Sequence, residues 1–282
     1  MQLYNAYMQL WKEGNVCAGF SPRLPDYAIR YWLDHLQNAI TLAKPRSFLD
    51  IGAGDGRLSL LLLRTGCNQG AAIEVQPNKH AWEPILNHYG RFELHEGLLQ
   101  ELTPQFNTQH KTFDFILLAE VFEHIPPSDV PAFLQHLYSV LTKNGTIFLT
   151  TPNFTALGPA EKSPQWHERQ PWGHHKHYAF GELKTLLAAH GFKVQWHGFE
   201  CHKIKSIVYN RWFYPISRLD ARLIGSRKLP AAIRLAYRAL SGPLMLLAKG
   251  CFWALAQLVY AIEKRKSNER TAGTMMMMIK KV

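Results

Sequence analysis

Residues 48–58, FLDIGAGDGRL, constrain the fold more than any other segment, because they join an apolar run, a glycine-rich turn and the start of a helix. Glycines let the backbone turn sharply and approach a ligand, and the helix that follows presents free N–H groups. This pattern indicates a nucleotide-like ligand. Position 57 is Arg, where dinucleotide-binding proteins place a third glycine, so a nicotinamide or flavin dinucleotide is disfavoured. Asp50 and Asp55 suit a cationic ligand better than a pyrophosphate.

Short apolar runs alternate with helical patterns over residues 47–200, which predicts a parallel, doubly wound α/β sheet. Residues 45–202 would form this core, after an N-terminal helical extension over 1–44. The tail 274–279, TMMMMI, predicts one more buried strand within 271–282. The expected strands are 47–51, 71–75, 91–94, 113–118, 146–150, 193–197 and 274–279, and the expected core helices are 57–65, 79–88, 129–142 and 180–190.

The basic residues of the chain are concentrated in residues 203–270, a segment whose composition differs from that of the rest of the chain. The formal net charge is +11, and this segment holds fourteen Lys and Arg against three acidic residues. It is also apolar and predicts two or three helices punctuated by Pro215, Pro230 and Pro243. A basic, apolar insertion before the last strand points to an acidic partner, either a lipid surface or a nucleic acid.

Glu74 ends the second expected strand, twenty-two residues after Gly52, where a carboxylate can accept hydrogen bonds from both hydroxyls of a ribose. Together with LDIGAGDG at 49–56, FDFILLAEVFEH at 113–124 and LYSVLTKNGTIFLTTPN at 137–153, it resembles the class I S-adenosylmethionine-dependent methyltransferases. The resemblance covers about residues 46–200 and the tail strand. It implies a seven-stranded Rossmann-like sheet and S-adenosylmethionine as the cofactor.

The same resemblance assigns the cofactor-binding residues. Asp50, Gly52 and Gly54 would surround the methionine part of the cofactor, and Glu74 would hold its ribose. Where this family often places an acid after the third strand to bind the adenine amine, this chain has EGLL at 96–99, so adenine would contact backbone groups or Glu101. The full expected set is Asp50, Gly52, Ala53, Gly54, Asp55, Gly56, Glu74, Val75, Leu99, Ala119 and Glu120.

Carboxylates and histidines follow two neighbouring strands: EVFEH at 120–124 and HHKH at 174–177. Both segments follow carboxyl ends of strands, where ligands bind in doubly wound sheets. One interpretation is a general base with its orienting acid; the candidates are His124 first and His175 second, with Glu123. The other is a divalent metal site.

The metal interpretation has its own resemblance. Small-RNA 3′-terminal ribose methyltransferases use E-x-x-E-H and a later histidine to hold a divalent ion, and the matching residues would be Glu120, Glu123, His124 and His175. The same pattern also resembles small-molecule O-methyltransferases, including those of ubiquinone biosynthesis. We favour the small-molecule class without a metal, and keep the RNA enzyme as the alternative. The aromatic loop 166–173 would form a lid over the acceptor.

A lipid surface explains the insertion better than RNA, because residues 243–262 form an apolar stretch with one charge, Lys249. A helix lying on the membrane is expected rather than a span, since the tail strand must return to the same sheet. The N-terminal residues lack the pattern of a secretory signal, so we expect a cytoplasmic protein, peripheral on the inner membrane face. The expected function is O-methylation of a small-molecule or lipid-linked acceptor. The alternatives are RNA ribose methylation and a non-catalytic, membrane-attached protein that binds the cofactor.

Overall fold

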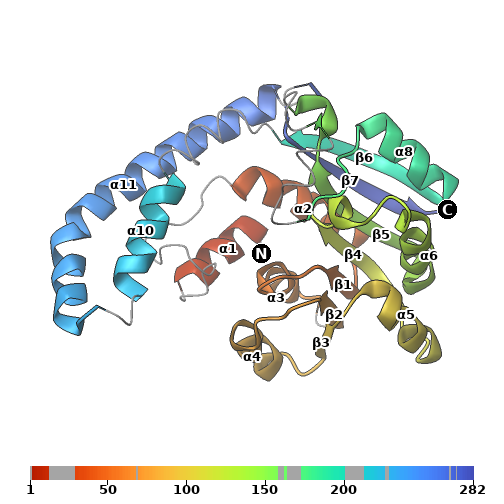
Figure 1. Cartoon of the computed structure of the whole chain (residues 1–282), viewed down its shortest axis with the longest axis horizontal. Helices are drawn as coiled ribbons and strands as arrows, with labels where there is room; N and C mark the ends of the chain where they lie inside the picture. The colour runs from red at the N-terminus through yellow and green to blue at the C-terminus, as the bar shows by residue number, and fades with distance from the viewer. Residues whose placement is uncertain are drawn as a thin grey trace.

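The structure is a computed structural model that describes residues 2–12, 29–67, 69–157, 162–163, 173–200, 213–225, 229–266, 268–270 and 272–282. A seven-stranded sheet lies on one side of the molecule, and a long pair of helices extends from it (Figure 1). Most of the expected lid, and parts of the insertion at 203–212 and 226–228, lie outside the described residues.

The strand order is β3-β2-β1-β4-β5-β7-β6, and only β7 runs antiparallel to its neighbours. The chain starts in the middle at β1, continues outward to one edge, and returns to the other side of β1 with β4. Ligands bind at this reversal, outside the carboxyl ends of the strands. The strands are β1 (Ser47–Ile51), β2 (Gln69–Glu74), β3 (Phe92–Glu96), β4 (Phe113–Ala119), β5 (Leu141–Pro152), β6 (Phe192–Glu200) and β7 (Thr274–Lys281).

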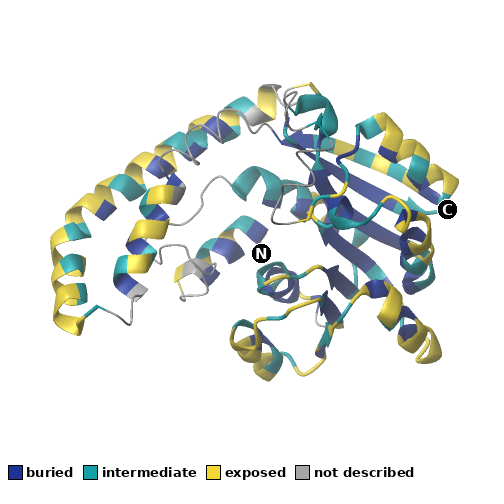
Figure 2. Ribbon diagram, viewed as in Figure 1, coloured by how far each residue is buried: buried dark blue, intermediate teal, exposed yellow. Residues whose placement is uncertain are grey.

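Helices cover both faces of the sheet, and each face has its own hydrophobic core. On one face lie α5 (Leu99–Thr108), α6 (Val130–Val140) and α8 (Phe180–Ala189); on the other lie α1 (Leu3–Lys12), α2 (Arg30–Ala43), α3 (Arg57–Arg64) and α4 (Lys79–His88). Strand side chains alternate between the two cores, and the sheet is buried throughout its middle (Figure 2). The predicted doubly wound, seven-stranded α/β sheet is confirmed.

The run of four methionines in β7 follows from this double burial. Met275 and Met277 contribute to one core, and Met276 and Met278 to the other. A strand buried on both faces has no position for a polar side chain, so its sequence is continuously apolar. The tail is therefore a core strand, as its composition predicts.

Two expectations about helices were wrong. The helix α5 was missed, because Pro104 interrupts its pattern; Glu101 caps it by accepting a 2.8 Å hydrogen bond from the Leu98 N–H. Pro243 was expected to end a helix, yet it lies inside α11 (Ala231–Lys266), which continues through it. A proline removes one backbone hydrogen bond and bends a long helix without always ending it.

The insertion forms a helical arm, defined here as α10 (Tyr214–Gly225) and α11. Phe213, Met245, Phe252 and Ala256 form a small core between the two helices, and Tyr4 and Met8 of α1 pack against it. Tyr4 and Met8 also pack against one core of the sheet, so α1 connects the arm to the sheet.

Candidate functional site

The glycine turn after β1 is held open by backbone geometry. Gly52, Gly54 and Gly56 all have positive φ angles, of 69°, 57° and 77°, which favour glycine. The N–H groups of Gly52 and Ala53 donate to the carbonyl of Ile73 at the end of β2. Trp82 on α4 was not predicted; its indole N–H donates a 3.0 Å hydrogen bond to the Gly54 carbonyl. The turn is thus fixed to β2 on one side and to α4 on the other.

Glu74 lies directly beside this turn. Its Oε2 accepts a 2.7 Å hydrogen bond from the Gly54 N–H, and its Oε1 accepts one of 3.2 Å from the Gln76 N–H. A carboxylate has further lone pairs on both oxygens, so these two bonds leave acceptor capacity for a diol. The sequence placed this residue correctly at the end of the second strand.

Asp50 and Asp55 are already engaged inside the protein. Asp50 is buried and accepts a 2.6 Å hydrogen bond from the Ser59 hydroxyl, and burial raises the pKa of its carboxyl to about 7. Asp55 pairs with Arg57 at 2.7 Å. Asp50 therefore supports the turn from inside the protein, whereas Asp55 is partly exposed.

A cavity of about 880 Å³ opens beside Gly52 and Glu74. Of the expected cofactor residues, Gly52, Glu74, Val75, Leu99 and Glu120 line it. Gly97, Leu98, Gln100, Val121, Ile125, Pro126, Ser128, Asp129, Ala132 and Phe133 are among the other lining residues. The lining combines the carboxylates of Glu74, Glu120 and Asp129 with apolar side chains such as Leu99 and Phe133, so it suits a ligand with a sugar and a flat ring.

Glu120 ends β4 in a left-handed backbone conformation, with φ of 54°. Such a conformation is strained for a residue with a side chain, and β5 holds it in place. The Glu120 N–H donates to the Thr150 carbonyl at 3.0 Å, and the Thr150 hydroxyl donates to Glu120 Oε1 at 2.8 Å. This turn of the chain lets Glu120, Val121, His124, Ile125 and Pro126 line the cavity.

Glu123 and His124 follow in the short helix η2 (Phe122–His124). Glu123 is buried and accepts a 2.9 Å hydrogen bond from the Thr151 hydroxyl, a partner that was not predicted. Burial, and then the neighbouring charge of Glu120, raise the pKa of Glu123 to about 8. His124 lines the cavity, so η2 places one imidazole at the surface of the cavity and one carboxyl behind it.

The histidine cluster meets η2, but through His174 rather than His175. Potential ligand atoms of Glu123, His124 and His174 all lie within 4.8 Å of one another. The His124 and His174 rings meet edge to face with centroids 4.6 Å apart, and His174 Nδ1 lies 2.8 Å from Nε2 of the buried His177. His175 is exposed, and its backbone N–H donates to the Glu123 carbonyl at 2.8 Å.

The fold and this site define a nucleotide-binding α/β protein with an acid and imidazole cluster at the cavity. A family model described as a methyltransferase domain matches residues 26–196. This match covers more than half of the chain, which therefore belongs to that family. The predicted family, the class I S-adenosylmethionine-dependent methyltransferases, is confirmed, and S-adenosylmethionine with it as the cofactor.

Curated relatives support the family. The chain is 28% identical over 203 residues to the mitochondrial ubiquinone biosynthesis O-methyltransferase of Bos taurus, covering 66% of this chain and 53% of that protein. It is 31% identical over 159 residues to the ubiquinone biosynthesis O-methyltransferase of Parvibaculum lavamentivorans, covering 52% and 59%. The chain spans about half the length of the curated relatives it matches.

A solved structure has the same fold. The crystal structure of an S-adenosylmethionine-dependent methyltransferase from Archaeoglobus fulgidus matches with a TM-score of 0.52 at 18% identity, and the match covers 98% of this chain and all of that one. The fold likeness thus extends over the whole chain.

Proposed function

We propose that this protein transfers the methyl group of S-adenosylmethionine to a hydroxyl of a small-molecule or lipid-linked acceptor that it meets at a membrane surface. The observation that carries the proposal is the position of His124, which borders the cofactor cavity and has Glu123 and His174 directly beside it. Relatives named as ubiquinone biosynthesis O-methyltransferases support a small, ring-containing acceptor.

The residues present fit the cofactor. A Cβ at Gly54 would meet no atom within 4 Å, so the space beside the turn at this residue is open, and the Glu74 carboxylate has acceptor capacity for a ribose. Gly52, Glu74, Val75, Leu99 and Glu120 would contact it. S-adenosylmethionine supplies an electrophilic methyl group on a positively charged sulfur, which becomes neutral when the methyl leaves.

His124 would act as the general base, because a neutral imidazole can take the proton of a phenol or sugar hydroxyl. The acceptor oxygen forms its bond to the methyl carbon, and the hydroxyl proton passes to His124. Glu123 and His174 would hold the His124 ring in place. Alignment of the acceptor oxygen with the methyl carbon contributes on the order of 7–11 kcal/mol to a displacement reaction, and a base adds about 10²–10⁴-fold in rate.

A metal-dependent mechanism is the second candidate, favoured by the mutual approach of Glu123, His124 and His174 within 4.8 Å. Two imidazoles and one carboxylate suit a divalent ion such as Zn²⁺ or Fe²⁺. His174 replaces the predicted His175 in this set. With a metal, an RNA 3′-terminal ribose would be an acceptor whose two hydroxyls could bind the ion.

The test is transfer of labelled methyl groups by the purified protein, with and without a chelator. The acceptors would be a catechol with a short isoprenoid tail, a saccharide, and a short RNA with a free 3′ ribose. Label in the catechol that is insensitive to chelator supports the histidine base. Label that the chelator abolishes supports the metal-dependent mechanism. Label in RNA would mean that the acceptor is RNA and not a small molecule. Cofactor binding without any label would instead support the non-catalytic alternative. Fractionation of cells would test the expected cytoplasmic, membrane-peripheral location.

A further inference from the structure

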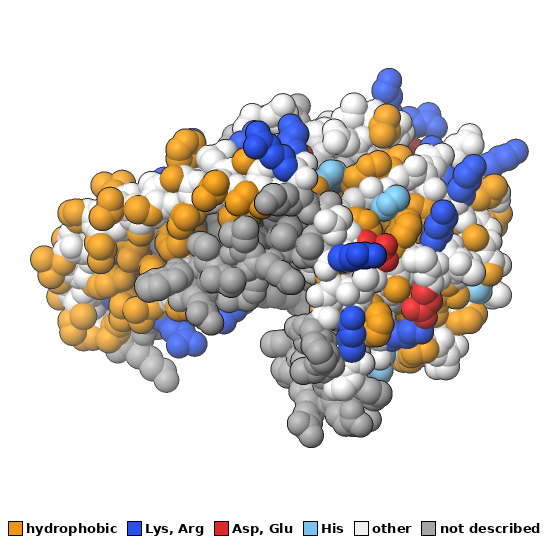
Figure 3. Space-filling model, turned by 90° about the horizontal axis from the view of Figure 1, so that it is seen from above, with side chains coloured by type: hydrophobic (Ala, Val, Ile, Leu, Met, Phe, Trp, Pro, Cys, Tyr) orange, Lys and Arg blue, Asp and Glu red, His pale blue; other side chains and the backbone are white. Residues whose placement is uncertain are grey.

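The helical arm exposes an unusually apolar surface. Large hydrophobic side chains on the arm with more than half of their surface exposed are Leu219, Ile233, Leu235, Leu240, Leu244, Leu246, Leu247, Trp253 and Leu258. Figure 3 shows hydrophobic side chains spread over this end of the molecule. By length and composition Ala231–Ile262 could cross a membrane, yet only 22% of its most apolar window is buried. A surface of this kind marks an interaction site.

The exposed apolar residues form one side of α11. At roughly 100° per residue, Ile233, Leu240, Leu244, Leu247 and Leu258 fall within about 60° of arc, and Leu235, Leu246 and Trp253 extend this to about half of the circumference. Over residues 232–262 the charges are Arg234, Arg238 and Lys249, and all three fall on the opposite half. From Ile233 to Leu258 the apolar side extends over about 38 Å.

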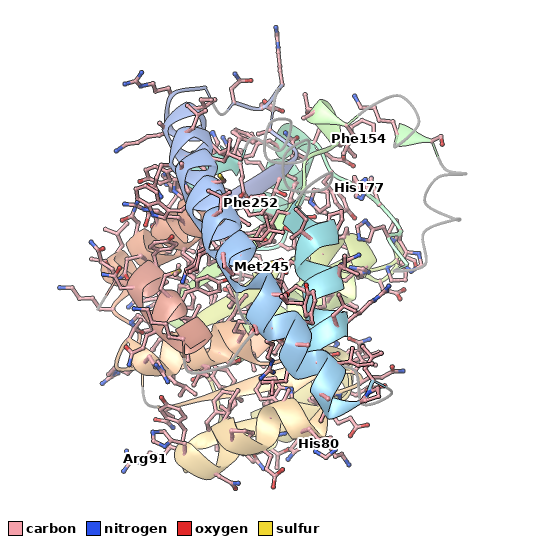
Figure 4. The ribbon with its side chains drawn as sticks, turned by 90° about the vertical axis from the view of Figure 1, so that its left-hand side faces the viewer. His80, Arg91, Phe154, His177, Met245 and Phe252 are labelled. Carbon is pink, nitrogen blue, oxygen red and sulfur yellow. The ribbon has the colours of Figure 1, made fainter. Side chains whose placement is uncertain are left out.

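The opposite side of α11 is attached to the protein. Met245 and Phe252 lie on α11 where it passes α10 (Figure 4), and both belong to the small core of the arm. Farther along, α2 contacts α11 near the edge of its apolar half: Gln257, which falls beside Leu246 around the helix, accepts a 3.1 Å hydrogen bond from Arg30, and the Tyr260 hydroxyl donates a 2.8 Å hydrogen bond to Asp34. The Arg30 guanidinium also lies 4.6 Å from the centre of the Tyr260 ring. The arc of Ile233, Leu240, Leu244, Leu247 and Leu258 lies opposite Met245 and Phe252 and therefore faces outward.

The same contacts argue against a spanning orientation. A bilayer crossing by the apolar stretch 243–262 would carry the Arg30 and Asp34 contacts at Gln257 and Tyr260 into hydrocarbon, where charged groups are costly. Thr274, eight residues after the end of α11, also begins β7, which lies in the sheet between β5 and β6. The helix can bury its apolar side only by lying in the plane of the membrane.

The positive charge of the helical arm indicates which kind of surface it binds. Residues 213–266 contain ten Lys and Arg against two acids. The exposed Lys264 and Arg265 follow the apolar side at its C-terminal end, and the exposed Arg222 lies on α10. Lysine and arginine next to a buried apolar side bind anionic head groups. A second copy of the arm would bring the same positive charges together, so self-association is disfavoured.

We propose that the apolar side of α11 lies in the interface of an anionic phospholipid bilayer, with Leu240, Leu244, Leu247 and Leu258 inserted among the acyl chains and Lys264 and Arg265 at the phosphates. The surface deepens the proposed function, because a lipid-linked acceptor would then be met where it resides. The proposal depends on the proposed function only for the purpose of membrane binding, because the binding itself is argued from the helical arm.

The test is flotation of the full-length protein with preformed vesicles of phosphatidylcholine alone, or with about 30 mol% phosphatidylglycerol. We expect flotation with the anionic vesicles, at least about tenfold weaker partition to the neutral ones, and release by alkaline carbonate. L244E/L247E should lower the partition at least about tenfold, because two inserted leucines become charged. K264Q/R265Q should mainly lower the preference for anionic vesicles and its sensitivity to salt.

L42E/V282E is the matched control, since Leu42 and Val282 are as exposed as the arm leucines but lie on α2 and at the C-terminus. It should float like the parent protein. Equal loss in both double variants, no flotation of the parent protein, or resistance to carbonate would each overturn the proposal. Loss of a dimer in L244E/L247E without lipid would assign the surface to a second copy instead.

Methyl transfer to a soluble catechol separates this proposal from the proposed function. L244E/L247E should retain that transfer while losing vesicle binding. A protein that binds vesicles but methylates no acceptor would contradict the proposed function and leave the membrane surface standing.

Discussion

The Thr151 hydroxyl donates a 2.9 Å hydrogen bond to Oε2 of Glu123, and both side chains are buried. Thr151 lies near the end of β5, and Glu123 lies in η2 after the neighbouring strand β4. The bond therefore joins the two strand ends on which the candidate site is built. It fixes the carboxyl directly behind His124.

The first prediction concerns this bond. Thr151→Val should lower kcat for methyl transfer about 10–100-fold, because a buried carboxyl left without its hydrogen bond costs about 1–3 kcal/mol and Glu123 would no longer be held beside His124. Cofactor affinity should stay within about twofold, since Thr151 does not line the cavity. Steady-state kinetics and calorimetric titration of the cofactor measure the two effects separately.

Thr146→Val is the control on the same strand. Thr146 is equally buried, but its hydroxyl has no hydrogen-bond partner among the described residues, so its removal should leave activity unchanged and stability unchanged or higher. Equal loss of activity in the two variants would mean that any change in β5 disturbs the site, and that the Thr151 bond has no particular role.

The second prediction concerns Glu74. Glu74→Gln removes the charge and one of the acceptor oxygens next to the glycine turn, so the dissociation constant for S-adenosylmethionine should rise about 10–100-fold. At saturating cofactor kcat should change little. Glu96 pairs with Glu74 in the register of β2 and β3 and is exposed, so Glu96→Gln is the matched control. A similar affinity loss in both variants would indicate general electrostatics instead of a ribose contact.

The third prediction is a pH dependence of stability. The pKa of Asp50 is about 7 in the folded protein and about 3.9 in an unfolded chain, so folding holds a proton that unfolding releases. The stability from this group is fully present below pH 4 and is lost as the pH rises toward 7. Asp50→Asn cannot titrate. In thermal melts, the melting temperature of the variant should therefore rise relative to that of the parent protein between pH 4.5 and pH 8. Parallel pH profiles of the two melting temperatures would refute the idea that Asp50 binds a proton in the folded protein.

Local geometry explains which parts of the site the sequence could predict. The glycine turn and Glu74 follow from the order strand, turn, helix, strand, which alone brings residues 52–56 next to the end of β2. His124 was found for the same reason, since η2 directly follows β4. Residues tied to the end of a strand have few possible positions.

Residues in loops were harder to place. His174 and His175 are neighbours, and a small rotation of the loop decides which side chain faces Glu123. The spacing of residues in the sequence does not reveal that rotation. Thr150 and Thr151 could have been found from the pairing of β5 with β4, because Thr150 lies opposite Ala119, next to Glu120. Trp82 gave no usable signal, since an aromatic residue on an amphipathic helix is ordinarily part of the core.

The last prediction concerns the contact between Gly52 and Val121. A Cβ at Gly52 would lie 2.5 Å from Val121 Cγ2, too close for any real contact, and the φ of 69° adds strain. Gly52→Ala should lower both the melting temperature and the cofactor affinity, because both residues line the cavity. Gly54 has a similar φ of 57°, but a Cβ there would meet no atom within 4 Å. Gly54→Ala should therefore lower the free energy of unfolding only by the conformational cost of about 1–2 kcal/mol.

Adding Val121→Ala to Gly52→Ala separates the two costs. The double variant removes the clashing methyl group, so it should regain part of the melting temperature and fall to about the level of Gly54→Ala, after correction for Val121→Ala alone. A double-mutant cycle from thermal melts gives this coupling. If Val121→Ala does not restore any of the melting temperature, the close approach of residues 52 and 121 does not limit the size of the side chain at position 52. Glycine would then be required there only for its backbone conformation.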